Sequence, residues 1–240
     1  MYTRLVIVAV IAEKGGWGKT TLSLDLAVTA VQKGHKAAIL DVDPEATASK
    51  WTDRRTEELP WVVPTHAVRL GAATEQAKAQ GVDFIVIDTP PHSSADAAEA
   101  ARRADVVVSP VEPHLFGLET VSKLADLLRV AGDPPSFFVI NKAPTQGTEG
   151  ANAVEYIKQQ GFKVCPTVIH LRAAHRHASN IGKTAAEYEA DSKAAQENIT
   201  AIRVYTQACK HPKENRCQSR IRSRRGLNSN RLRPVSLRNL

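Results

Sequence analysis

Residues 5–21 decide the fold and read Leu-Val-Ile-Val-Ala-Val-Ile-Ala-Glu-Lys-Gly-Gly-Trp-Gly-Lys-Thr-Thr. The apolar, β-branched run Leu5–Ala12 is typical of a strand that is buried on both faces. A glycine-rich loop follows directly, and Lys19–Lys33 then repeats apolar residues at helical spacing. In this order, backbone N–H groups and the N-terminus of a helix bind phosphate. The stretch therefore predicts a phosphate-binding loop, which a chance glycine turn would not explain.

Different residues of the loop are suited to bind different parts of a nucleotide and its metal ion. Glycines let the backbone turn tightly and point its N–H groups at phosphate oxygens, while Lys19 reaches the β- and γ-phosphates. The Thr20 hydroxyl is suited to ligate Mg²⁺. The usual pattern has a glycine five residues before Gly18, where this chain has Glu13, and Lys14 adds a second lysine.

Beyond the loop, apolar runs alternate with helical patterns. Strands are predicted at Ala37–Leu40, Trp61–His66, Phe84–Ile87, Val106–Ser109, Phe137–Ile140 and Val164–Ile169. Helices are predicted at Ser94–Ala104, Leu118–Ala131, Val154–Gln160 and, as one long helix, Thr184–Cys209. The alternation predicts an α/β fold with a doubly wound, mostly parallel sheet and helices on both faces. Ligands of such sheets bind beyond the carboxyl ends of the strands.

Composition and charge narrow the class of protein. The 240 residues are 42% hydrophobic and 24% charged, and no run is long enough to be a transmembrane helix. Three cysteines make no disulfide framework, so we expect a cytoplasmic protein. From residue 210 to 240 the chain has ten basic residues and one acid, against 22 and 24 in residues 1–209. We expect one domain over 1–209 and a disordered basic tail over 210–240. The tail either binds nucleic acid or anionic lipid, or has no selected role.

Three ordered boxes resemble those of one family. Lys14–Thr21 resembles the deviant Walker A box of the ParA/MinD superfamily of P-loop ATPases, Ile39–Pro44 its Asp-x-Asp-Pro box, and Phe84–Pro91 its Walker B strand. Ile169–Tyr188 is similar to the family's C-terminal region. The resemblance extends to about residue 208 and is greatest to the short ParA partition ATPases. It implies a three-layer α/β/α P-loop NTPase fold.

The resemblance implies roles for individual residues. It implies an ATP-dependent sandwich dimer in which Lys14 crosses to the partner's phosphates, with Lys19 and Asp43 as the other catalytic residues. The implied ATP contacts are Gly15, Gly16, Trp17, Gly18, Lys19, Thr20, Thr21 and Asn141. The implied Mg²⁺ ligands, direct or through water, are Thr20, Asp41 and Asp88. From the residues alone, Asp41 and Asp43 could equally cap a helix or a turn, and Asn141 could have a turn role.

The resemblance also implies a cellular function. ParA-like proteins bind DNA without sequence specificity as ATP-bound dimers, and the candidate residues here are Arg172, Arg176, Lys183, Lys193 and Arg203. We expect slow ATP hydrolysis that a ParB-like centromere-binding partner and DNA accelerate, in a nucleoid-associated cytoplasmic protein that segregates a plasmid or chromosome. Two alternatives stay open. One is a membrane-positioned regulator like MinD, which would bind lipid through its C-terminus, although the sequence there does not predict the amphipathic helix this requires. The other is an ATPase accessory to conjugative DNA transfer.

Overall fold

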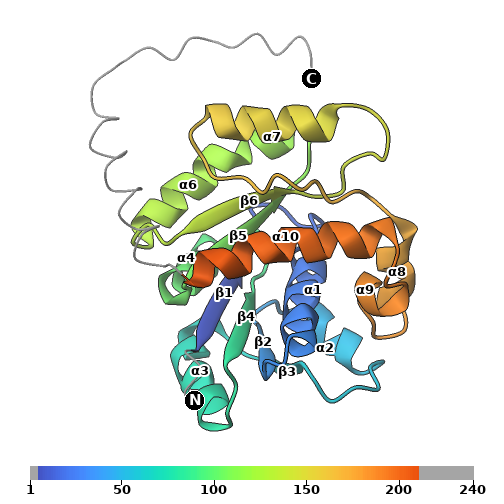
Figure 1. The fold of residues 1–240 in the computed structure, drawn as a ribbon. Helices are drawn as coiled ribbons and strands as arrows, with labels where there is room; N and C mark the ends of the chain where they lie inside the picture. Colours follow the sequence, from blue (N-terminus) through green and yellow to red (C-terminus); the bar gives the residue numbers. More distant parts are fainter. Residues whose placement is uncertain (1–4, 211–240) are drawn as a thin grey trace.

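A parallel sheet forms the centre of the molecule, as Figure 1 shows. The computed structural model describes residues 5–210. The six strands are β1 (Val6–Val10), β2 (Ala37–Asp41), β3 (Trp61–Pro64), β4 (Phe84–Asp88), β5 (Val106–Val111) and β6 (Ser136–Ile140). Their order in the sheet is β3-β2-β4-β1-β5-β6, and each neighbouring pair is parallel. Strand β1 thus lies between β4 and β5, so the loop that follows it emerges among the carboxyl ends of its neighbours.

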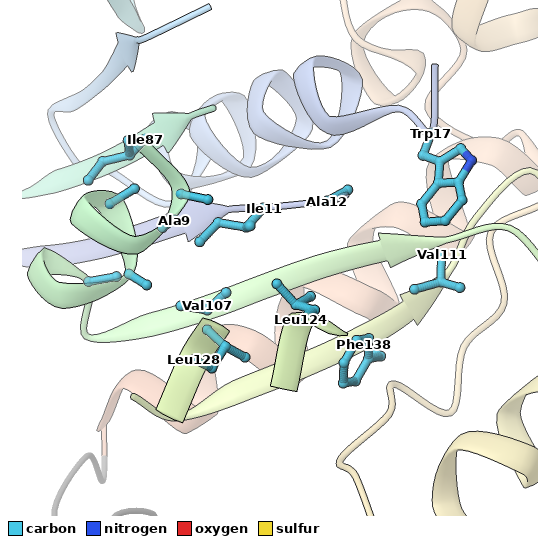
Figure 2. Close-up of a cluster of buried hydrophobic side chains, with 14 of the residues drawn as sticks. Ala9, Ile11, Ala12, Trp17, Ile87, Val107, Val111, Leu124, Leu128 and Phe138 are labelled. Atoms are coloured by element: carbon cyan, nitrogen blue, oxygen red, sulfur yellow. The ribbon is translucent and has the colours of Figure 1, made fainter. Parts of the chain in front are cut away.

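Helices cover both faces of the sheet. The α-helices are α1 (Lys19–Gln32), α2 (Thr47–Thr52), α3 (Leu70–Ala79), α4 (Ser94–Arg103), α5 (Leu115–Leu118), α6 (Thr120–Val130), α7 (Glu149–Gln159), α8 (Ala173–Ser179), α9 (Ala185–Tyr188) and α10 (Lys193–Lys210). Side chains of α1, α2 and α10 share one buried cluster with Val8 and Val10 of the central strand. Those of α3, α4, α6 and α7 share the other cluster with Ala9 and Ile11 (Figure 2). This arrangement confirms the predicted α/β class and explains why β1 is apolar at every position.

The predicted strand Val164–Ile169 is wrong as a strand. This segment makes two isolated parallel bridges, Phe138 with Val164 and Ala143 with His170, and it belongs to none of the six strands. Pro166 lies in its middle and has no backbone N–H to donate. The chain therefore follows the edge of β6 without extending the sheet, and it carries residues 169–172 past the phosphate loop.

The single helix predicted over Thr184–Cys209 is also wrong, because the structure has two helices there. Helix α9 ends at Tyr188 and α10 begins at Lys193. Ser192 accepts a hydrogen bond on its Oγ from the Ala195 N–H at 3.2 Å, which caps the new helix. Among the described residues, no helix has the length and apolarity needed to cross a bilayer.

A buried polar contact joins α1 to α10. Asp25 is 4% exposed, and its Oδ2 accepts a hydrogen bond from Asn198 Nδ2 at 2.7 Å. Burial raises the pKa of Asp25 to about 8, and the charge of Glu187 adds to the rise. The carboxyl group is therefore mostly protonated at neutral pH, and its ionisation opposes folding.

This carboxyl group predicts a pH-dependent stability. In the unfolded chain Asp25 ionises near pH 4, so between about pH 4 and pH 8 the folded state holds a proton that the unfolded state has lost. Its contribution to stability therefore falls as the pH rises through this window. Asp25→Asn should match the wild type near pH 4 and exceed its unfolding free energy by roughly 2–5 kcal/mol at pH 8. Urea unfolding at several pH values measures this, with the exposed Asp126→Asn as the control. Parallel pH profiles for wild type and Asp25→Asn would contradict the prediction.

Candidate nucleotide site

The glycine loop has the backbone shape that a phosphate cradle needs. Gly16 and Gly18 have φ angles of 80° and 85°, in the left-handed region that glycine favours. Gly18 is the N-cap of α1, and no side chain caps that helix. The free N–H groups of its first turn therefore point out of the helix, where an anion can accept their hydrogen bonds. Lys19 begins the helix and is 6% exposed.

Two hydroxyls hold the chain that leads into the loop. Thr89, directly after β4, donates from Oγ1 to the Val10 carbonyl oxygen at 2.8 Å. Ser109 of β5 donates from Oγ to the Ile11 carbonyl oxygen. Both hydroxyls are buried. The last residues before the loop are thus fixed from both neighbouring strands.

The end of β6 holds the loop itself. Asn141 donates from Nδ2 to the Trp17 carbonyl oxygen at 2.8 Å, and Lys142 donates from Nζ to the Gly16 carbonyl oxygen. Lys142 has a φ of 54°, which is strained for a residue with a side chain. The contact of Asn141 is with the protein backbone, so its predicted adenine contact stays a prediction.

Asp88 provides the feature that fits a metal ion. It is fully buried at the end of β4, and its Oδ1 accepts a hydrogen bond from Ser23 Oγ at 3.0 Å. Its Oδ2 is buried and has no hydrogen-bond partner among the described residues. Burial raises the pKa of Asp88 to about 7, which the Thr20 and Ser23 hydroxyls and the Lys19 charge oppose. An unpaired carboxylate oxygen beside a threonine hydroxyl suits Mg²⁺, which Thr20 and Asp88 would hold.

A bound cation would change the ionisation of this site. Positive charge beside Asp88 favours the carboxylate over the acid, which reverses the effect of burial. Burial also lowers the pKa of Lys19, while the charges of Asp88 and Asp43 oppose that shift. The loop lysine and the β4 carboxylate therefore lie close enough to influence each other's pKa.

Asp41 is the last residue of β2, and Asp43 lies in the hydrogen-bonded turn that follows. Asp41 is buried, and its carboxylate accepts hydrogen bonds from the N–H groups of Asp43 and Ser49 and from the Ser49 hydroxyl. Burial raises its pKa, and these hydrogen bonds oppose the rise. Asp43 accepts from the Glu45 N–H at 2.9 Å with one carboxylate oxygen. Both aspartates thus support the turn, and their roles with water and Mg²⁺ remain predictions.

Lys14 lies against aromatic side chains of its own chain. Its Nζ is 5.9 Å from the centre of the Trp17 ring and 5.4 Å from that of the Phe116 ring, within the range of cation–π attraction. The His114 ring lies edge-on to both. Trp17 is 4% exposed and lies beyond the end of β1, near Val111 (Figure 2), whereas Phe116 is 64% exposed. The second lysine is therefore half-buried and held against two aromatic rings of its own chain.

An open cavity continues from the loop. It has a volume of about 450 Å³ and is lined by Thr21, Lys142, residues 171–173, His175, Arg176, Ser179 and Asn180. Its size suits a small organic ligand. Because Thr21 lies in the first turn of α1, a nucleotide whose phosphates are bound by the loop has room for its nucleoside here.

The basic residues predicted to bind DNA differ in their surroundings. Arg172 makes a close ion pair with Glu197, with Nη2 to Oε1 at 2.6 Å, and Glu197 also accepts from His170. Arg176 of α8 and Lys193 of α10 are exposed, and Lys183 is half-buried. Helices α8, α9 and the start of α10 lie together at one end of the molecule (Figure 1). The side chain of Arg203 and the predicted tail lie outside the described part.

Several functional contacts were not foreseen from the sequence. Ser23 touches the aspartate of the site and Lys142 touches the loop, yet neither belongs to a motif that we singled out. The position of Ser23, one helical turn after Lys19, could have identified it, because residues i and i+4 share a helix face. Lys142 gave no such signal, since only the tertiary fold brings it to Gly16.

Comparisons with known proteins agree with this geometry. The family model described as "CobQ/CobB/MinD/ParA nucleotide binding domain" matches residues 8–185. The maintenance of carboxysome distribution protein A of Gloeobacter kilaueensis is 29% identical over 208 residues, which cover 80% of this chain and 93% of that protein. The chromosome-partitioning ATPase Soj of Thermus thermophilus is 26% identical over 224 residues, with 78% and 90% covered.

Solved structures show the same fold. The MinD cell division protein of Aquifex aeolicus matches with a TM-score of 0.69 and 16% identity, covering 84% of this chain and 97% of that one. The septum site-determining protein MinD of Pyrococcus horikoshii, complexed with Mg-ADP, matches with a TM-score of 0.66 and 20% identity, covering 82% and 94%.

Gly18 provides a test of the loop geometry. A Cβ at this position would lie 2.4 Å from Asn141 Nδ2, whereas a Cβ at Gly34, whose φ is 86°, would meet nothing within 4 Å. Gly18→Ala and Gly34→Ala share the same backbone strain, about 1 kcal/mol. Only Gly18→Ala should displace Asn141 and weaken Mg-ADP binding, by about tenfold or more. Calorimetric titration of both variants measures this, and equal affinities would contradict the prediction.

Proposed function

Because the chain belongs to the CobQ/CobB/MinD/ParA nucleotide-binding family, we propose that it is a ParA-type ATPase that segregates plasmid or chromosomal DNA. The family's members are nucleotide-binding ATPases, and curated relatives at 25–29% identity include chromosome-partitioning and sporulation proteins named Soj. The observation that carries the proposal is the pair of loop lysines. Lys19 is buried beside Asp88, while Lys14 lies on the rings of Trp17 and Phe116.

The two lysines suggest how ATP controls assembly. Phosphoryl transfer is accelerated mainly by positioning and by positive charge around the phosphates. In the proposal, Lys19 supplies charge within each chain, and Lys14 leaves its aromatic rings to reach the phosphates bound by a second copy. Hydrolysis is then slow in isolated chains and requires the dimer. Asp43 orients the attacking water, and Asp41 supports the shell of Mg²⁺ that Thr20 and Asp88 bind.

In this proposal the dimer binds DNA because it presents two copies of a basic surface that binds DNA only weakly in one chain. Each chain supplies a small number of phosphate contacts, from Arg176 on α8, Lys183 just before α9 and Lys193 at the start of α10. Arg172 and Arg203 add to them. Two copies in one dimer raise the affinity through effective concentration, without sequence readout. A ParB-like centromere-binding partner then stimulates hydrolysis and releases the DNA. In this proposal the protein works in the cytoplasm on the nucleoid.

A second candidate has a different cargo. Two of the relatives are maintenance of carboxysome distribution proteins, which match at 29% and 25% identity over most of their length. The same ATP-gated DNA binding would then position a protein compartment. The two candidates differ in the partner protein, so the adaptor that stimulates hydrolysis distinguishes them. Roles in conjugative transfer or at a membrane use the same nucleotide site but lack a specific supporting observation.

Lys14 provides the first test of the proposal. Wild type should bind duplex DNA with ATP and much less with ADP, and Lys14→Gln should abolish this difference while it leaves Mg-ADP affinity unchanged. Binding by chains ending at Lys210 separates this effect from the basic tail, whose contribution should fall steeply between 50 and 200 mM salt. Lys78→Gln removes the same charge from the exposed surface of α3, outside the loop, and serves as the control. Nucleotide-independent DNA binding by chains ending at Lys210 would overturn the ATP switch.

Arg176 provides a test of the DNA surface. Arg176→Ala should weaken ATP-dependent DNA binding about threefold to tenfold with unchanged unfolding, because one phosphate contact is lost from each chain of the dimer. The exposed Arg129→Ala on α6 should have no effect. Arg172→Ala should also lower stability, since it leaves Glu197 without its ion pair. Fluorescence anisotropy with labelled duplex measures all three variants, and equal affinities for Arg176→Ala and Arg129→Ala would count against this surface.

A further inference from the structure

One buried arginine ties the end of α2 to residues 182–187, which lie between α8 and α10. The Arg55 side chain is 2% exposed, and its Nη1 donates to the Gly182 carbonyl oxygen at 3.0 Å. Its Nη1 and Nη2 also donate to the two oxygens of Glu187, at 3.1 and 2.7 Å. Glu187 in turn accepts hydrogen bonds from the N–H and the hydroxyl of Thr184, in the capping box of α9. Arg55 therefore holds this segment through a backbone carbonyl and through the start of a helix.

Trp51 of α2 makes another connection to the same segment. It is 1% exposed, and its Nε1 donates to the Lys183 carbonyl oxygen at 3.2 Å. The guanidinium group of Arg55 lies 4.7 Å from the centre of its ring, within the range of cation–π attraction. The N–H of Lys183 donates to the Ala178 carbonyl oxygen of α8 at 3.0 Å. The backbone of Lys183, a residue of the proposed DNA surface, is therefore fixed between α2 and α8.

The two backbones approach so closely that only glycine fits at their contact. A Cβ on Gly182 would lie 2.5 Å from the backbone nitrogen of Arg55, and the φ of Gly182 is 67°. Packed contacts of this kind do not deform continuously. A shift of α2 must therefore either move residues 182–187 with it or break the hydrogen bonds of Trp51 and Arg55.

The other end of α2 is capped from the candidate nucleotide site. Its N-cap residue, Ala46, has no side-chain oxygen, and its φ of 51° is strained for a residue with a side chain. The N–H and the hydroxyl of Ser49, in the first turn of α2, donate instead to Asp41 Oδ2, at 3.3 Å each. Asp41 lies directly beside Asp88 in the sheet. The start of α2 thus depends on a carboxylate of the site rather than on a cap of its own.

We propose that Arg55 and Trp51 are positioning residues, which set the place of Lys183 on the DNA surface according to the nucleotide that is bound. The inference rests on the proposed function, in which Asp41 supports the shell of Mg²⁺ and Lys183 contacts DNA. ATP brings more negative charge toward Asp41 than ADP does, so the hold of this carboxylate on the strained start of α2 differs between the two states. The difference reaches Lys183 through Trp51 and Arg55, within each chain and in addition to the doubling by the dimer.

Binding of the full chain to labelled duplex DNA, with ATP and with ADP, tests the inference. Arg55→Lys keeps the charge but loses the paired hydrogen bonds to Glu187. It should lower the ratio of DNA affinity with ATP to that with ADP about fivefold or more. Mg-ADP affinity, by calorimetry, and ATP-dependent dimer formation, by sedimentation velocity, should stay unchanged. Arg54→Lys is the matched control, because Arg54 is the exposed neighbour of Arg55, and it should leave the ratio unchanged.

A double-mutant cycle tests the link to the nucleotide site. Ser49→Ala removes the hydroxyl that donates to Asp41, at the opposite end of α2 from Arg55. If both residues act on one route, Ser49→Ala should lower the ratio by itself. The double variant should then lower it no further than the stronger single variant. Effects of the two substitutions that add in free energy would overturn the route through α2.

The other outcomes have distinct meanings. An unchanged ratio in Arg55→Lys, or an equal loss of DNA binding with ATP and with ADP, would mean a structural role alone and would overturn the inference. A loss of dimer formation would show that the substitution acts on the contact between chains, and would also overturn it. A wild type whose DNA binding ignores the nucleotide would overturn the proposed function itself, and this inference with it. Should Arg55→Lys not fold, Trp51→Phe, which removes the Nε1 donor and keeps an aromatic ring, decides on the same ratio.

Discussion

The site depends on one constraint: side chains from the neighbouring strands donate hydrogen bonds to the carbonyl oxygens in and just before the phosphate loop. Thr89, after β4, donates to the Val10 carbonyl oxygen, and Ser109 of β5 donates to that of Ile11. After β6, Asn141 donates to the Trp17 carbonyl oxygen and Lys142 to that of Gly16. With these oxygens engaged, the N–H groups of the loop remain available for an anion. Strand β4 lies on one side of β1 and β5 and β6 on the other, and because all are parallel their carboxyl ends meet where the loop emerges. The sheet topology thus brings the donors to the loop.

Three buried ionisable groups in and near the site lower the stability of the folded protein. Asp25 and Asp88 are buried carboxyl groups whose pKa values are raised to about 8 and about 7, and Lys19 is a buried amine whose pKa is lowered. Each shift means that the charged form is less stable in the folded protein than in water. A bound cation and phosphates would reverse the two shifts at the loop but not that of Asp25. Ligand binding therefore stabilises the very charges that oppose folding.

Much of the fold could be predicted because the pattern is local. The buried runs of β1, β4 and β5 and the loop with its helix follow from residue order alone, and the structure places them as expected. The predictions failed where one residue interrupts a run, as Pro166 does in the expected last strand and Ser192 in the expected last helix. The buried contact between Asp25 and Asn198 could not be predicted, because the two residues are far apart in the sequence and meet only when α10 packs on α1.

The three tryptophans share a feature with a practical consequence. Each ring faces a cation of its own chain: Lys14 at Trp17, Arg55 at Trp51 and Lys36 at Trp61. The latter two contacts lie away from the loop, and the Arg55 side chain is only 2% exposed and paired with Glu187. Under the proposed function, only Trp17 has a partner that leaves its ring, because Lys14 moves to a second copy of the chain. Its indole emission is thus a built-in optical signal for the position of Lys14, readable without any attached label.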